Sequence, residues 1–372
     1  MRVLFWSERF WPTIGGVGLS ASKLLPALVA RGHEFIVITL KEYAELPEED
    51  GYKEIPVYRL PFWTALATGN TSQFIELRQR IAHLKRSFAP ELIHVNFLGS
   101  SVLFHFQTAA VQPAPLLVSL DSALPHEVIG HDSLAGRTLR AADWVTCVSA
   151  ARLTQVRKLV PEITPRSSFI YQGSKVPSHL PESLPTEAPR LLCLGRLVPG
   201  KGFDLALTAF TLILARFPAA RLVIAGDGPA RSELEQLAAE LGVSDTVSFV
   251  GWIYPDEVPT VINTATLMVV PSRQESFGLV ALEAALMARP VIATHVGGLP
   301  EIIVDKHTGL LVEPENSSAL AEAIMFLLDR PEIAIQMGQA ARVRVQEVFS
   351  WDHYVEAYDA LYQKLVRKTG ES

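Results

Sequence analysis

The sequence has 372 residues, a formal net charge of -6, 49% hydrophobic residues and 19% charged residues. This length exceeds what one ordinary hydrophobic core fills, so two or three domains are expected, and the composition excludes a disordered chain. The acidic balance argues against a nucleic-acid partner, because proteins that bind a phosphate backbone usually carry an overall basic excess.

Cysteine and hydropathy patterns bear on the cellular compartment. Cys147 and Cys193 lie far apart in apolar, strand-like runs and are expected to be reduced core residues. The first apolar run, residues 3–6, is too short for a signal peptide or a membrane anchor. No later run approaches the roughly eighteen apolar residues that span a bilayer. We predict a cytoplasmic protein, with association to a membrane surface left open.

Apolar strand-like runs alternate with helical patterns along the chain. The first set of predicted strands is residues 3–6, 35–39, 56–60, 91–95, 116–120, 144–148 and 168–171. A second set follows a proline-rich polar segment and comprises residues 190–194, 221–225, 247–250, 267–270, 291–294 and 309–312. This alternation predicts an α/β protein with two Rossmann-like, doubly wound domains, each built on a parallel sheet that helices cover on both faces.

The domain boundaries follow from that interruption. Residues 1–177 are predicted to form the first domain, residues 178–189 a linker and residues 190–349 the second domain. Residues 350–372 are predicted to form an amphipathic closing helix. One path open to this helix crosses back to the first domain. Two such domains place the carboxyl ends of their strands across a cleft, where open α/β sheets bind ligands.

A strand, a turn and a helix are predicted where the sequence reads PSRQESFGLVALEAALMA, residues 271–288. Ser276 is a candidate N-cap for a helix that begins near Phe277. The backbone N–H groups of Phe277, Gly278 and Leu279 would then be free donors at the positive end of the helix dipole. Because Gly278 has no Cβ, a ligand can approach the backbone closely there. The stretch therefore predicts an anion site.

Two glutamates flank this anion site. Glu275 lies in the turn, and Glu283 lies about two turns into the predicted helix, on the face that also carries residues 276, 279 and 280. Only a long ligand reaches both carboxylates, and a nucleotide sugar has that length, with a diphosphate between its sugar and its ribose. Taken alone, the two glutamates are more simply explained as a loop charge and a solvated helix residue.

Glycine-rich loops follow the first strand of each predicted domain. In the first loop Gly15 and Gly16 allow backbone to touch a phosphate, and a plain tight turn is an equal alternative. In the second loop, GRLVPGKG, Arg196 and Lys201 provide a guanidinium fork and a point charge suited to a diphosphate. Isolated basic residues in a loop are more often solvated. The first loop lacks the GxGxxG pattern of dinucleotide-binding loops, and the second lacks the residue spacing of the Walker motif of P-loops.

Further candidate positions are weaker. Asp121 ends the predicted strand 116–120 and is a candidate to hold or deprotonate an acceptor hydroxyl, with a capping or turn aspartate as an equal alternative. The turn at Gly251 is a candidate contact for a nucleotide base. No HExxH motif, cysteine cluster or Asp-x-Asp occurs, so no bound metal is predicted. The apolar stripe of helix 72–89 is predicted to pack in the core, with membrane-surface docking as the less favoured alternative.

Taken in order, GGVG, GRLVPGKG, GDGP, PSRQESFGLVALEA and HVGGLPEII resemble the motifs of the retaining nucleotide-sugar glycosyltransferases of the GT-B fold, family 4. The resemblance covers nearly the whole chain. It implies two Rossmann-like domains, a metal-independent mechanism and a donor bound mainly by the second domain. By position it implies that Arg196 and Lys201 hold the diphosphate, that Glu275 contacts the donor sugar and Glu283 the ribose, and that Gly16 closes on the phosphates.

Two positions depart from the family pattern. Asp121 stands where the family usually has a histidine in a context like TLHG, whereas this chain has SLDS. Ala288 replaces the glycine that usually ends the helix of the second glutamate. That position is left-handed, and a non-glycine residue there costs about 1 kcal/mol.

The sequence therefore predicts a metal-independent transfer of a sugar from a nucleoside diphosphate donor to an acceptor hydroxyl, with retention. The predicted catalytic residues are Glu275, Asp121, Lys201 and Arg196, and no cofactor besides the donor substrate is expected. A UDP-sugar is favoured over a GDP-sugar, and the acceptor is a saccharide, a lipid-linked molecule or a small molecule. A nucleotide-sugar epimerase of the same fold is one alternative. A nucleotide-sugar-binding protein with weakened catalysis is another, because of Asp121.

Overall fold

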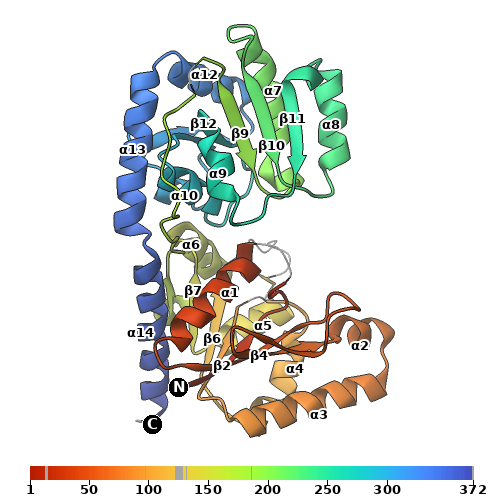
Figure 1. Ribbon diagram of the computed structural model, residues 1–372. Coiled ribbons are helices and arrows are strands. Elements are labelled where there is room, and N and C mark those ends of the chain that lie inside the picture. Colours follow the sequence, from red (N-terminus) through yellow and green to blue (C-terminus); the bar gives the residue numbers. More distant parts are fainter. Residues whose placement is uncertain (13–15, 97, 122–128, 131, 186, 371–372) are drawn as a thin grey trace. The chain divides into compact units, whose positions relative to one another are not determined.

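The computed structural model describes residues 1–372 except 13–15, 97, 122–128, 131, 186 and 371–372, and it leaves out the side chains of residues 16–17 and 368–370. The chain divides into two compact units (Figure 1). The first unit contains Met1–Tyr171 together with Asp352–Ser372, and the second contains Gln172–Trp351. In chain order the second unit is therefore inserted within the first.

The first sheet has eight strands in the order β3-β4-β2-β1-β5-β6-β7-β8. They are β1 (Arg2–Trp6), β2 (Glu34–Leu40), β3 (Glu49–Tyr52), β4 (Ile55–Leu60), β5 (Leu92–Val95), β6 (Leu116–Leu120), β7 (Trp144–Cys147) and β8 (Ser167–Phe169). The apolar runs predicted every one of these strands except β3. All neighbouring pairs are parallel apart from β3 and β4, so the sheet is mixed.

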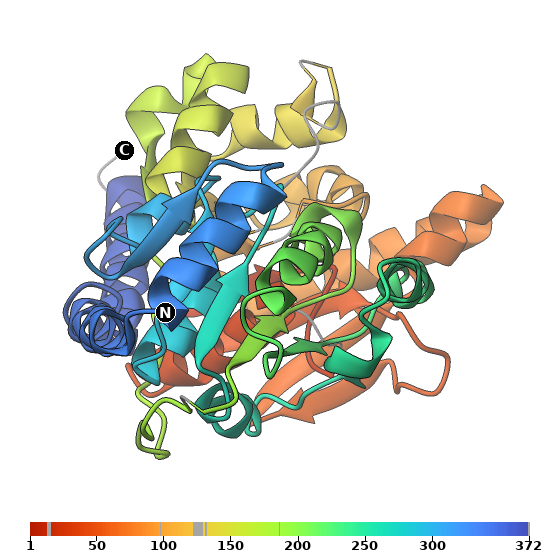
Figure 2. The same cartoon turned by 90° about the horizontal axis from the view of Figure 1, so that it is seen from above.

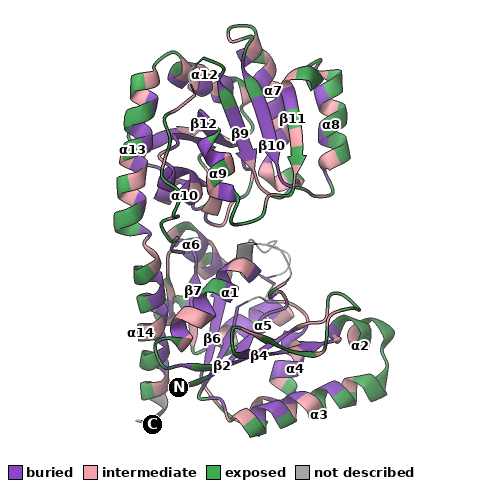
Figure 3. Ribbon diagram, in the orientation of Figure 1, coloured by how far each residue is buried: buried purple, intermediate pink, exposed green. Residues whose placement is uncertain are grey.

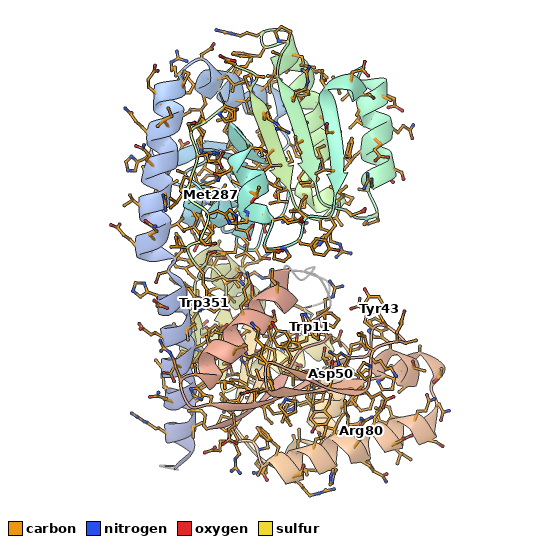
Figure 4. All side chains as sticks on the ribbon, in the orientation of Figure 1. Trp11, Tyr43, Asp50, Arg80, Met287 and Trp351 are labelled. Atoms are coloured by element: carbon orange, nitrogen blue, oxygen red, sulfur yellow. The ribbon has the colours of Figure 1, made fainter. Side chains whose placement is uncertain are left out.

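The unpredicted strand β3 has the polar sequence EDGY and lies at the edge of the sheet. No apolar periodicity marks such a strand, because polar residues are common on sheet edges. It is held by ion pairs instead. Asp50 accepts a hydrogen bond from the buried Arg59 at 3.0 Å, and Arg80 of the helix α3 (Thr71–Phe88) bonds to Glu48 and Glu49 at 2.6 and 3.1 Å (Figure 4).

The other helices of the first unit are α1 (Gly16–Val29), α2 (Phe62–Thr68), α4 (Val102–Gln107), α5 (Leu134–Ala141), α6 (Ala150–Leu159) and α14 (Trp351–Gly370). The predicted stripe on α3 packs in the core, where Leu77, Ile81 and Leu84 are buried. Lys85, a basic residue of the same helix, is also buried. It donates to the Nδ1 and carbonyl oxygen of His105 at 3.3 Å, and burial lowers its pKa to about 7.

Helix α14 packs on the first sheet, on the face opposite to α3. Ile93 belongs to the core cluster on the α3 side, and side chains alternate along a strand, so His94 points the other way. The His94 Nδ1 lies 2.6 Å from the Tyr362 hydroxyl, and its Nε2 lies 2.6 Å from the Ser119 hydroxyl. Ser119 also contacts the Tyr358 hydroxyl at 3.1 Å. The closing helix thus returns to the first unit and completes a buried polar network there.

The second sheet has six parallel strands in the order β11-β10-β9-β12-β13-β14. They are β9 (Arg190–Leu194), β10 (Arg221–Ala225), β11 (Val247–Gly251), β12 (Leu267–Val270), β13 (Val291–Thr294) and β14 (Gly309–Val312). All six agree with the predicted runs to within one residue. Most of their residues are buried, as the ribbon of β9, β10 and β12 shows (Figure 3). A continuous apolar run is what a parallel strand covered on both faces requires.

Helices cover both faces of this sheet. They are α7 (Phe203–Leu214), α8 (Arg231–Glu240), α9 (Val258–Asn263), α10 (Leu279–Leu286), α11 (Leu299–Ile302), α12 (Ser317–Leu328) and α13 (Pro331–Val348). The strand order reverses direction between β11 and β12, so right-handed crossovers place α7 and α8 on one face and α9 and α10 on the other. Helix α12 packs beside α7 (Figure 2), and α13 packs against α10.

The segment 178–189, predicted to be a linker, lies within the second unit and is anchored along it. The Asn263 side chain donates to the carbonyl of Leu180 at 2.9 Å and accepts from the backbone N–H of Glu182 at 3.2 Å. Arg289 donates to the carbonyl of Glu182 at 2.8 Å. The proline-rich composition indicated that this segment is irregular. It could not show that the segment is fixed in place, because the side chains that hold it lie about eighty residues or more away in sequence.

Candidate active site

Two loops of the second unit meet at the carboxyl edge of its sheet. Strands β9 and β12 are neighbours, so the loops that follow them, residues 195–202 and 271–278, lie side by side. The Lys201 ammonium donates to the Glu275 carboxylate at 2.5 Å, and the Ser272 hydroxyl donates to the same carboxylate oxygen at 3.4 Å. The structure thus brings together two of the residues that the sequence singled out.

This ion pair is partly buried, with 28% of the Lys201 side chain and 11% of the Glu275 side chain exposed. An ammonium group has three N–H donors, so the contact with Glu275 leaves donors for a further ligand. Arg196, in the same loop as Lys201, is exposed, and its side chain makes no hydrogen bond or ion pair with any other residue that the structure describes. Two cations of one loop are therefore available for an anionic ligand.

Arg273 ties the two loops together, a role that the sequence did not reveal. Its guanidinium donates to both carboxylate oxygens of Asp204 at 2.7 Å and to the carbonyl of Pro199 at 3.0 Å. The hydrogen bonds with Asp204 raise the pKa of Arg273, and those from Arg273 lower the pKa of Asp204. The Arg273 backbone N–H also donates to the carbonyl of Gly200 at 2.9 Å. Arg273 therefore fixes the Lys201 loop against the Glu275 loop.

Two glycines, Gly202 of the Lys201 loop and Gly297 of the loop after β13, allow close packing against the Glu275 loop. Gly202 has φ of +66°, and a Cβ there would overlap the carbonyl oxygen of Pro271. Gly297 has φ of +54°, and a Cβ there would overlap the carbonyl oxygen of Glu275. Both positions combine a left-handed backbone with close backbone contact, and only glycine satisfies both conditions.

Helix α10 begins two residues later than predicted. Gly278, at φ of +114°, is its N-cap, so the predicted cap at Ser276 and the start near Phe277 are wrong. The left-handed backbone at Gly278 is incompatible with an earlier helical turn, and it is a conformation that the letter G alone does not reveal. Phe277 is instead a core residue whose ring lies 5.8 Å from that of Phe349. The free donors of the helix therefore begin at Gly278 and Leu279.

Because α10 begins later, Glu283 lies just over one turn into the helix, not two. The predicted face is nevertheless present. Leu279, Val280 and Glu283 are half-buried, whereas the other residues of α10 are buried. The predicted left-handed position after the helix is confirmed, since Ala288 has φ of +52°.

In the first unit, Asp121 and Asn96 lie at the carboxyl edge of the sheet. Asp121 follows β6 and Asn96 follows the neighbouring strand β5, so the two side chains meet. The Asn96 amide donates to the Asp121 carboxylate at 2.7 Å. Burial raises the pKa of Asp121 to about 6, and the hydrogen bond from Asn96 opposes that rise. The position of Asn96 directly after a strand, the same signal that indicated Asp121, could have identified it.

The remaining predicted positions are less informative. Gly15 lies outside the described residues, and Gly16 is the first residue of α1. Gly251 ends β11, which is two strands from β9, roughly 10 Å at the usual strand spacing. Within the described part of the chain, no group of three or more His, Cys, Asp or Glu side chains could hold a metal ion. Among the helices in that part, none is long and apolar enough to cross a membrane.

Comparisons with known proteins match both halves of the chain. The model of Glycosyltransferase Family 4 matches residues 14–173, and the model of Glycosyl transferases group 1 matches residues 178–344. Glycogen synthase of Mycobacterium tuberculosis is 28% identical over 406 aligned residues, which cover 100% of this chain and 96% of that protein. A GDP-mannose-dependent alpha-(1-6)-phosphatidylinositol monomannoside mannosyltransferase of the same organism is 39% identical over 173 residues, 45% of each chain.

Solved structures resemble the chain over nearly its whole length. Sucrose-phosphate synthase from Thermosynechococcus elongatus has a TM-score of 0.86 and 25% identity, and the likeness covers 99% of both chains. HepE of Anabaena, in complex with UDP-glucose, has a TM-score of 0.80 and 20% identity, over 98% of this chain and 100% of that one. The two sheets, the motifs on their carboxyl edges and the matching domain models agree, and the chain belongs to the family 4 glycosyltransferases of the GT-B fold.

Proposed function

We propose that this protein transfers a sugar from a nucleoside diphosphate donor to an acceptor hydroxyl, with retention of the anomeric configuration. The observation that carries the proposal is the contact between Lys201 and Glu275, a cation and a carboxylate placed together by the loops after β9 and β12. In this arrangement Lys201 holds a phosphate oxygen while Glu275 accepts a hydrogen bond from a sugar hydroxyl. One ion pair then recognises both the diphosphate and the sugar of a single donor.

These cations are needed because negative charge develops on the departing diphosphate. As the glycosidic bond breaks, negative charge grows on the phosphate oxygen, and groups already fixed around that oxygen stabilise it best. Lys201 and Arg196 offer positive charge, and the amides at Gly278 and Leu279 offer donors at the positive end of α10. These groups supply the charge neutralisation for which a divalent cation is otherwise used. We therefore propose that transfer is independent of added metal, and activity retained in excess chelator is the expected result.

On the acceptor side, Asp121 is the proposed contact of the attacking hydroxyl. Its carboxylate is held by Asn96 and accepts a hydrogen bond, as a group that orients a hydroxyl must. Since its pKa is about 6, the carboxylate is mostly ionised at neutral pH. A saccharide, a lipid-linked molecule or a small molecule remains the proposed acceptor class.

A UDP-sugar is the favoured donor, with a GDP-sugar as the alternative. HepE, which shares the fold, was solved with UDP-glucose, whereas the mannosyltransferase similar to part of this chain is named for GDP-mannose. The first experiment is a thermal-shift screen over UDP-, GDP- and ADP-sugars. A ligand at 100 times its dissociation constant stabilises the folded state by about 2.7 kcal/mol, so the true donor is readily distinguished.

Turnover with that donor then tests the site. Lys201→Ala is expected to lower kcat by about 10²- to 10³-fold, the loss typical when one preorganised donor to a developing anion is removed. Glu275→Ala is expected to lower kcat as well, because it removes the acceptor of the sugar hydroxyl and the partner of Lys201. Lys306→Ala is the control, because Lys306 is exposed and precedes β14. It therefore lies at the amino edge of the sheet, opposite to the carboxyl edge that carries the donor loops. Near-normal rates in both site variants, with the fold intact, would contradict the proposal.

The alternatives are separated by the same assays. Both domain models describe glycosyltransferases, which does not favour an epimerase. Conversion of the donor sugar without any acceptor would nevertheless identify one. A binding protein with weakened catalysis would bind the donor tightly and show neither transfer nor hydrolysis.

A further inference from the structure

A pocket of about 680 Å³ lies in the second unit, away from the donor loops. Its walls are residues 181–184 of the anchored segment and one face of α13, and its floor is Ala288 and Arg289, which follow α10. Met287, labelled in Figure 4, marks this end of the helix. The donor loops lie at the other end of α10, roughly 12 Å away for eight helical residues. A ligand in this pocket is therefore not the donor.

The floor of the pocket carries a buried positive charge. Arg289 is 1% exposed, and its guanidinium donates to the carbonyls of Glu182 and Asn263 at 2.8 and 2.7 Å. Its weaker bonds go to the carbonyls of Ile262 and Met287 and to the Asn263 side-chain amide. All these acceptors are neutral, and no carboxylate of the described residues lies within ion-pair distance of Arg289. Burial lowers the pKa of Arg289, and the charge of Glu182, which also lines the pocket, opposes that shift without forming an ion pair. A buried cation that is not paired with a carboxylate favours a further anion nearby.

A second arginine lines the wall. Arg342 projects from α13, and its Nε is buried without a hydrogen-bond partner among the described residues. An unsatisfied buried donor is unfavourable, and a hydrogen-bond acceptor in the pocket would satisfy it. Gln339 and Gln346 lie three residues before and four residues after Arg342, on the same face of the helix, and also line the pocket. Exposed apolar side chains of Ile335 and Val343 complete this wall.

We propose that this pocket is a second ligand site, which binds a small phosphate monoester through the guanidinium of Arg342. An arginine fork matches the geometry of a phosphate, and the charge of Arg289 at the floor adds to the attraction. The glutamine amides supply further donors, and Ile335 and Val343 contact the organic part of the ligand. The volume lies within the range of small-molecule sites. Bound there, the ligand touches Ala288 and Arg289 and thereby the helix that carries Glu283.

The test measures binding of glycerol 3-phosphate and of inorganic phosphate to the full chain by calorimetry, with glycerol as the uncharged control. The donor loops also attract phosphates, so the measurement is made on wild type, Lys201→Ala and Arg342→Gln. Saturable binding is expected to persist in Lys201→Ala and to weaken at least tenfold in Arg342→Gln. Arg330→Gln is the matched control, since Arg330 precedes α13 and stacks on Phe326, outside the pocket. It is expected to bind as wild type does.

Two results would overturn this proposal. One is binding that disappears in Lys201→Ala and persists in Arg342→Gln, which would place the phosphate at the donor loop. The other is no binding of either phosphate up to about 10 mM, the limit of weak but specific affinity. Circular dichroism of Arg342→Gln confirms that it folds. Because the pocket does not depend on the donor site, failure here leaves the proposed transferase function untouched.

Discussion

Asp121 combines a position at the carboxyl edge of the first sheet with a raised pKa. The ordinary pKa of an aspartate is 3.8 and burial raises that of Asp121 to about 6, so the folded state binds more protons than the unfolded state between these values. Its contribution to stability is therefore fully present below pH 3.8 and is lost as the pH rises through 6. Asp121→Asn removes this dependence while it keeps a partner for Asn96.

The unfolding free energy of Asp121→Asn minus that of wild type is expected to be about 1 kcal/mol larger at pH 8 than at pH 5. Urea denaturation at the two pH values measures it. A difference that does not change with pH would show that the Asp121 carboxylate is not destabilised by burial.

Two glycines of one loop provide a matched pair of substitutions. A Cβ at Gly202 would meet the carbonyl of Pro271 in a left-handed backbone, whereas a Cβ at Gly200 would meet no atom of the described residues within 4 Å. Gly202→Ala is expected to displace the Glu275 loop, to lower kcat/KM at least tenfold and to lower the unfolding free energy by about 1 to 3 kcal/mol. Gly200→Ala is expected to leave both near wild type. Equal effects in the two variants would contradict the interlocked loops.

Single residues also mark the limit of prediction from sequence. Lys201 and Glu275 could be named because both lie in loops that follow predicted strands and within stretches that resemble the motifs of a known family, although charged loop residues taken alone are more often solvated. Arg273 could not, because its role depends on Pro199 in the other loop and on Asp204 in helix α7, and both approach it only in the fold. The burial of Lys85 was missed for a related reason, since its partner His105 comes from another helix.

At the scale of elements, apolar runs predicted strands well and glycines limited the helices. Parallel strands are buried on both faces, so their sequences carry a signal that needs no knowledge of the partners. Strand β3 lacks that signal because it is a polar edge strand. The start of α10 was misplaced because Gly278 adopts φ of +114°, which ends any helical turn before it.

The end of α10 gives a prediction at this scale. Ala288 has φ of +52°, where a residue with a Cβ is strained, so Ala288→Gly is expected to raise the unfolding free energy by about 1 kcal/mol. The control is Ala239→Gly, at an exposed position within α8, where the same change is expected to lower stability by about 0.5 to 1 kcal/mol. Chemical denaturation of both variants provides the measurement. The same sign in both would mean that the backbone at Ala288 is unstrained.

For the whole molecule, acid is expected to act on the two units differently. Burial lowers the pKa of His94 and of His105 to about 3, and Lys85 adds to the effect on His105. The unfolded state then binds more protons between pH 3 and 6.5, so stability falls as the pH falls through that window. Each histidine costs about 2 kcal/mol at pH 5, and the gain of about 1 kcal/mol at Asp121 on acidification offsets only part of this loss. Both belong to the first unit, whereas the described histidines of the second unit, His179, His295 and His307, are exposed.

Hydrogen exchange at pH 7 and pH 5, corrected for intrinsic rates, tests this difference. Amides in residues 1–171 and 352–372 are expected to lose protection at pH 5, and those in residues 172–351 to keep it. His94→Gln is a further comparison, because an uncharged side chain removes the proton-binding term at that position. Uniform loss of protection across both units would contradict the assignment.

The return of α14 to the first unit has a consequence for synthesis on the ribosome. Domains generally fold as they emerge, amino-terminal first. Here residues 172–351 can fold once they have emerged, but the first unit still waits for Tyr358 and Tyr362, which bond to Ser119 and His94. The part that is made first is thus completed last. Until then, its sheet exposes a face of apolar and polar groups whose cover has not yet been translated.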